Sequence, residues 1–119
     1  TKLLGLVLTN AKLIFDGKCC YGLLDYDTWT GYIDDKKKMD GIIENLRNID
    51  GVEIALFMYE TAKDEHKVSL RSINANVSSI ATALGGGGHM RAAGATVYGK
   101  ADELLENTIL PMIKKELNG

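Results

Sequence analysis

Apolar residues recur at helical spacing in four segments of the chain. The strongest pattern, from Met39 to Ile49, follows i, i+3, i+4 and i+7 and predicts a helix with one buried face. Asp34 or Asp35 is expected to cap its start, and Asp50-Gly51 to end it. The other predicted helices span Leu3–Ala11, Val77–Leu84 with Asn76 as the cap, and Ala101–Leu117, which Pro111 should kink or split.

Shorter apolar runs predict five strands. They are Leu13–Phe15, Cys19–Leu24, Val52–Tyr59, Lys67–Ser72 and Ala95–Tyr98. Asp16-Gly17 predicts a tight hairpin turn between the first two. Within Lys67–Ser72 apolar and polar residues alternate, so Arg71 is expected on the polar face of its strand. Together these elements predict an α/β fold, with a mixed sheet of about five strands flanked by helices.

The segments between these elements are mostly polar. Asp25–Gly31 is expected to form a loop or a short helical turn, in which Trp29 packs against the core. Thr61–His66 is expected to be a turn, with His66 exposed to solvent. Lys36–Lys38 is a basic run that is expected to be a solvated face.

Composition limits the classes of function. The chain has 119 residues, enough for one domain, and its formal net charge is −2. General attraction to a long nucleic acid needs a broadly basic face, so any phosphate must bind at a local site. The adjacent Cys19 and Cys20 would form a strained disulfide and are expected to be small buried side chains, which fits a reducing cytoplasm. No apolar run approaches the ~20 residues of a membrane span, and no membrane partner is expected.

The segment Gly85–Gly94, GGGGHMRAAG, is the most unusual in the chain. Four consecutive glycines cost conformational entropy, but they let another group approach the backbone, and successive N–H groups can form an anion-binding nest. His89 and Arg91 would add cationic or hydrogen-bonding groups. The loop follows a helix and precedes a strand, which is the reverse of a dinucleotide or P-loop site, so both of those sites are excluded.

Arg71 is the third candidate at this site. A guanidinium binds phosphate through two parallel hydrogen bonds. The alternative from local sequence is a surface arginine paired with a carboxylate, and both interpretations remain open at this point.

The glycine-histidine segment resembles the GGGHxxAAG signature of the DHH-associated C-terminal domain. Lys67–Ser72 and the predicted helix Val77–Leu84 resemble that family in order and spacing, and the similarity extends from about Ala11 to the C-terminus. The chain is most similar to the bifunctional oligoribonuclease and 3′-phosphoadenosine 5′-phosphate phosphatase type of DHH-family phosphoesterase. The resemblance implies a substrate-binding domain for short RNA or DNA oligonucleotides or nucleotide phosphates. By position, the substrate contacts would be Arg71, Gly86, Gly87, Gly88, His89 and Arg91.

The resemblance also implies a metal site that this chain lacks. Such enzymes hold Mn²⁺ in an N-terminal domain with an Asp-His-His motif, and the histidines here are only His66 and His89. We therefore expect no catalytic residue and no metal in residues 12–119, and we expect residues 1–11 to be the end of a linker helix from an N-terminal metal-binding domain. On its own, the chain should bind nucleotide weakly without hydrolysing it.

Two other functions remain open. Related domains occur in alanyl-tRNA synthetase, so the chain could be a non-catalytic nucleic-acid-binding module. The glycines could instead serve only a tight turn in a structural or dimerising domain. A homodimer is compatible with the sequence, which says little about oligomeric state.

Overall fold

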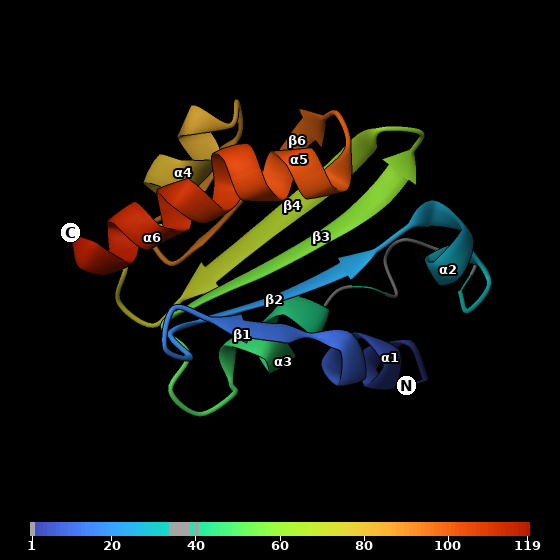
Figure 1. Cartoon of the computed structure of the whole chain (residues 1–119), viewed down its shortest axis with the longest axis horizontal. Coiled ribbons are helices and arrows are strands. Elements are labelled where there is room, and N and C mark those ends of the chain that lie inside the picture. The colour runs from blue at the N-terminus through green and yellow to red at the C-terminus, as the bar shows by residue number, and fades with distance from the viewer. Residues whose placement is uncertain (1, 34–38, 40) are drawn as a thin grey trace.

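The computed structural model describes residues 2–33, 39 and 41–119. Within these residues a six-stranded mixed sheet has the order β1-β2-β3-β4-β6-β5, and helices lie on both of its faces (Figure 1). Strands β2 and β3 are parallel, and every other neighbouring pair is antiparallel. The strands are β1 (Lys12–Ile14), β2 (Cys19–Leu24), β3 (Ile54–Ala62), β4 (Glu65–Ser72), β5 (Gly87–His89) and β6 (Ala92–Tyr98).

The predicted α/β class with a mixed sheet is confirmed. The additional strand is β5, which lies within the glycine run. Glycine has a low strand propensity, so the glycine-rich sequence gave no sign of β5. Strand β6 begins at Ala92, three residues before the predicted start at Ala95.

The helices agree with the predicted segments, although most are shorter. They are α1 (Lys2–Asn10), α2 (Tyr26–Thr30), α3 (Ile42–Arg47), α4 (Ser78–Ala83), α5 (Ala101–Leu104) and α6 (Leu110–Asn118). A π-helical turn, Leu105–Ile109, joins α5 to α6 just before Pro111, so the hydrogen-bonding pattern changes ahead of the proline while the helix continues through it. Asn76 caps α4, since its side-chain oxygen accepts from the N–H of Ser78. The predicted cap at Asp34 or Asp35 and the basic run Lys36–Lys38 lie outside the described residues. No described helix is both long enough and apolar enough to cross a membrane.

The sheet separates two apolar cores. One face packs against α4, α5 and α6, and the other packs against α1, α2 and α3. Cys19 belongs to the first core and Cys20 to the second, and both thiols are free and fully buried. The prediction of two small buried side chains on opposite faces is therefore confirmed. Trp29 of α2 is also buried, as predicted, and its ring N–H donates to the carbonyl of Glu60 at 2.7 Å.

The prediction for His66 was wrong. Strand β3 continues to Ala62 and β4 begins at Glu65, so His66 lies in a strand and not in a polar turn. The side chain shares the buried face with Val68 and Leu70, and only 4% of it is exposed. His66 Nε2 lies 2.9 Å from the carbonyl oxygen of Gly99. A carbonyl only accepts hydrogen bonds, so Nε2 carries the proton.

A glutamate holds the segment that follows β4. One carboxylate oxygen of Glu53 accepts from the backbone N–H groups of Ile73, Asn74 and Ala75, at 3.1, 2.7 and 3.0 Å. Burial works to raise the pKa of this carboxyl, but the backbone hydrogen bonds outweigh burial and lower it. The segment between β4 and α4 is thereby fixed just beyond Arg71.

Candidate functional site

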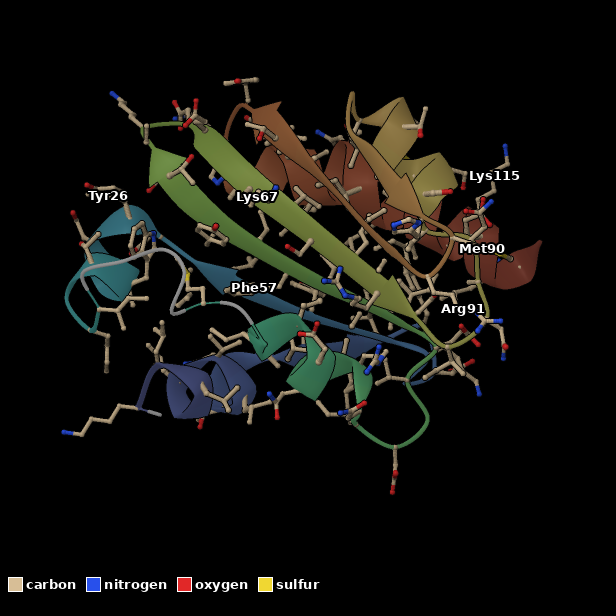
Figure 2. The ribbon with its side chains drawn as sticks, turned by 180° about the vertical axis from the view of Figure 1, so that it is seen from behind. Tyr26, Phe57, Lys67, Met90, Arg91 and Lys115 are labelled. Atoms are coloured by element: carbon tan, nitrogen blue, oxygen red, sulfur yellow. The ribbon has the colours of Figure 1, made fainter. Side chains whose placement is uncertain are left out.

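One half of a sheet face has no helix over it among the described residues. On the side of α1 and α3, the only described strands that contribute residues to the buried core are β2 and β3. In Figure 2 this side faces the viewer, and Lys67 lies on a strand that no helix crosses. We call the exposed half the open face. Its residues are Lys67, Ser69 and Arg71 of β4, Ala92, Gly94 and Thr96 of β6, and Gly87 and His89 of β5.

The strand register brings Arg71 and His89 to the same face. Arg71 pairs with Ala92 of β6, and Ala92 pairs with His89 of β5. Residues directly opposite each other in antiparallel strands share a face. With strands about 4.8 Å apart, the two backbones are separated by roughly 10 Å across the small Ala92 side chain. Two of the predicted site residues are thus placed together, although they lie far apart in the sequence.

The next row along the same face is nearly free of side chains. Ser69 pairs with Gly94, and Gly94 pairs with Gly87. The ammonium of Lys67 lies 3.9 Å from the point that a Cβ of Gly94 would occupy. We call Gly94 and Gly87 the glycine floor. Lys67 was missed in the sequence analysis, although its spacing of four residues from Arg71 already placed both cations on one face of the strand.

Two of the four glycines end a helix. Gly85 has a φ of +89°, its N–H donates to Thr82 at 3.0 Å, and the N–H of Gly86 donates to Ala81 at 2.8 Å. These are the two hydrogen bonds of a Schellman motif. Both N–H groups are therefore used within the helix end.

Close approach to β6 accounts for Gly86 and Gly88. A Cβ on Gly86 would overlap the carbonyl oxygen of Gly94 and lie 2.7 Å from the Cα of Ala95. Gly88 has a φ of +144°, and its Cβ would lie 2.7 Å from the Cα of Ala93. Packing against the neighbouring strand therefore requires glycine at both positions.

Gly87 has no such structural reason. A Cβ there would meet nothing within 4 Å, and its φ is not in the left-handed region. Its register partner Gly94 places it on the open face. Gly87 is therefore the glycine of the run that leaves the backbone accessible without being required by the fold.

Arg71 does pair with a carboxylate, as one of the two interpretations expected. Its Nε lies 3.5 Å from Glu44 Oε1 of α3, and its Nη1 donates to the carbonyl of Leu70 at 3.0 Å. A guanidinium has five N–H donors, so among the described residues three donors remain for a ligand. Pairing with Glu44 and binding an anion are therefore compatible.

Arg91 lies at the tip of the β5–β6 hairpin, as Figure 2 shows. The tip is anchored, because Ser72 donates to the carbonyl of Arg91 at 3.0 Å and Val77 donates to the carbonyl of Met90 at 2.7 Å. The Arg91 side chain is exposed and lies beyond the paired rows of the open face. The structure does not place it beside the glycine floor.

The described residues offer no obvious metal site. No three His, Cys, Asp or Glu side chains among them are grouped closely enough to hold an ion. The residues present therefore do not fit the Mn²⁺ implied by the resemblance, and the location of that metal in another domain stays a prediction.

Known proteins resemble this chain over nearly its whole length. The model of the DHHA1 domain matches residues 17–115. A bifunctional oligoribonuclease and PAP phosphatase NrnA from Thermus thermophilus is 32% identical over 117 residues, which are 98% of this chain and 34% of that protein. A protein of the same description from Mycoplasma pneumoniae is 42% identical over 57 residues, 48% of this chain and 18% of that protein. The chain thus spans about a third or less of these two relatives.

Two solved structures show the same fold. An exopolyphosphatase-related protein from Bacteroides fragilis superposes with a TM-score of 0.78 and 26% identity, over 98% of this chain and 33% of the other. The C-Ala domain of alanyl-tRNA synthetase from Aquifex aeolicus has a TM-score of 0.63 at 12% identity, over 92% of this chain and 99% of that domain. The second likeness concerns the fold alone. On the family match, which covers residues 17–115, the chain belongs to the DHHA1 domain family.

Proposed function

We propose that this chain is the substrate-binding domain of a DHH-family phosphoesterase, and that its open face binds the phosphate of short oligonucleotides or nucleotide phosphates. One observation carries the proposal: the strand register gathers Lys67, Arg71 and His89 around the glycine floor. A phosphate oxygen can approach the backbone there because Gly87 carries no side chain.

The three side chains have complementary roles in this proposal. Arg71 offers paired N–H donors in a plane, and Lys67 contributes a mobile point charge. His89 donates one hydrogen bond when neutral and two when protonated. Such charge-assisted contacts are local, so they are consistent with a chain whose net charge is −2.

Hydrolysis is assigned to another part of the parent protein. The relatives that match are longer, and each is described as a bifunctional oligoribonuclease and PAP phosphatase. We propose that the parent protein is a manganese-dependent phosphoesterase of this kind, acting in the cytoplasm. The 119-residue chain alone is expected to bind nucleotide weakly and to show no turnover with Mn²⁺.

A titration of the chain with 3′-phosphoadenosine 5′-phosphate and with the dinucleotide pApA, followed by amide NMR, tests the proposal. We expect shifts centred on Gly87 and His89, and on Arg71 across the sheet. Arg71→Ala and His89→Ala should each weaken binding, whereas Lys115→Ala, on the helix α6 that covers the other face, should not. Shifts confined to residues away from the open face would reject the site.

A second candidate is binding to transfer RNA. It is favoured by the shared fold of the C-Ala domain, which matches 92% of this chain. It predicts that the chain binds a folded transfer RNA more tightly than it binds pApA. The opposite order supports the phosphoesterase domain.

A further inference from the structure

Glu44 contacts the proposed site without facing the glycine floor. It lies on α3, and its Oε1 is 3.5 Å from Nε of Arg71. Both residues line a groove of about 370 Å³ between α3 and the open face, together with Lys67 and Ser69. The contact therefore links the helix that borders the open face to a cation of that face.

The Glu44 carboxylate is held in an unusual way. Although 40% of its side-chain surface is exposed, its Oε2 atom is buried and has no hydrogen-bond partner among the described residues. A buried acceptor without a donor is unfavourable, and native proteins retain few of them. Packing alone does not explain why a glutamate occupies this position.

The two contacts of Arg71 orient its guanidinium. Glu44 engages Nε, and the carbonyl of Leu70 engages Nη1. Neither contact uses Nη2, whose two N–H groups are free among the described residues. A long arginine side chain loses rotamer entropy when it binds, and prior orientation reduces that loss.

We infer that Glu44 is a positioning residue, which holds Arg71 in the orientation that receives a phosphate. The inference rests on the proposed function of the open face. It predicts that Glu44 acts through Arg71 alone. A glutamine at position 44 keeps an oxygen that can face Nε, whereas alanine removes it.

A ligand-free measurement tests the positioning directly. The ¹⁵N relaxation of the Arg71 Nε–H group is compared in the unaltered chain, Glu44→Ala, Glu44→Gln and the control Glu106→Ala, an exposed glutamate on the π-helical turn. The order parameter should fall in Glu44→Ala, and it should be retained in Glu44→Gln and in the control. An unchanged order parameter in Glu44→Ala would overturn the inference whether or not any ligand binds.

Binding of pApA then tests the consequence. Glu44→Ala should weaken binding roughly threefold to thirtyfold, as expected for residues in contact. The same substitution on an Arg71→Ala background should weaken it no further. An equal loss in both backgrounds would show that Glu44 acts independently of Arg71. If Arg71→Ala alone leaves binding unchanged, the proposed function of the open face fails, and the relaxation result still decides the positioning.

Discussion

Arg71 and His89 lie opposite the same residue, Ala92, from the two strands on either side of β6. Eighteen positions separate them along the chain, yet the register of two antiparallel ladders turns both toward one face. Ala92, which lies between them, has only a methyl group as its side chain. The space between the two side chains is therefore kept free by a small residue within the GGGGHMRAAG segment.

Gly86 and Gly87 should respond differently to alanine. Gly86→Ala forces a methyl group into β6 and should destabilise the chain by about 1–3 kcal/mol, as overpacking does. Gly87→Ala meets open space, so it should leave thermal stability unchanged or slightly raised while weakening pApA binding. Thermal unfolding and calorimetric titration of both variants check this. Equal losses of stability would indicate that the whole glycine run is structural.

Lys67→Ala should weaken pApA binding about fivefold and reduce its dependence on salt, because one cation fewer is neutralised at the phosphate. The measurement is the dissociation constant at several salt concentrations, and Lys115→Ala serves as the control. An equal decrease in pApA affinity and salt dependence for both lysine variants would indicate long-range attraction and not a contact at the glycine floor.

His66→Ala should lower stability by about 2 kcal/mol, because it leaves a cavity and deprives the carbonyl of Gly99 of its donor. Binding of pApA should be unaffected, since His66 faces the core opposite the open face. Urea unfolding and a titration separate the two effects. Loss of affinity with full stability would contradict the structural role.

Glu53 should contribute to acid unfolding. Its pKa is lowered in the folded chain from the ordinary value of 4.5. Its stabilising contribution is therefore complete above that value and is lost as the pH falls through the lower folded pKa. Glu53→Gln should destabilise the chain near pH 7 by about 1 kcal/mol, allowing for solvent exposure, and flatten the decline in stability between pH 5 and pH 3. Chemical denaturation at each pH measures the free energy of unfolding and its decline with acid, with Glu106→Gln as the control.

The cysteines should resist alkylation in the folded chain. Burial, and to a lesser extent the neighbouring Cys20, raises the pKa of Cys19 to about 12. Because the thiolate is the reactive form, N-ethylmaleimide at pH 8 should modify neither cysteine of the native chain and both in urea. Mass spectrometry counts the adducts. Rapid modification without denaturant would reveal local opening of the sheet.

Local patterns predicted most of the fold, because apolar periodicity reports burial directly. The hairpin at Asp16-Gly17, the cap at Asn76 and the alternation around Arg71 were all visible in short windows of sequence. His66 was missed because the residues around it are polar, and its partner Gly99 follows the end of β6, far away in the sequence. Strand β5 was missed because its residues have little strand propensity, and pairing with β6 forms it.

The candidate site was also predicted from the sequence only in part. The glycine-histidine segment identified the candidate residues, but local sequence did not show which glycine the fold leaves free. That distinction depends on where Gly94 and Ala95 of β6 lie relative to β5. Glu44 was likewise not a candidate, because its contact with Arg71 joins a helix to a strand more than twenty residues away.

The position of the open face also affects which substitutions the fold tolerates. Most of its side chains point away from both apolar cores, but Gly94 has to remain glycine, because a Cβ there would lie 2.8 Å from the backbone carbonyl oxygen of Val68. Substitutions at the exposed Lys67 and Thr96, and at Gly87, where a Cβ meets open space, should instead change ligand preference at little cost in folding. A single scaffold of this kind can therefore diversify its specificity along β4 and β6 while the interior stays the same.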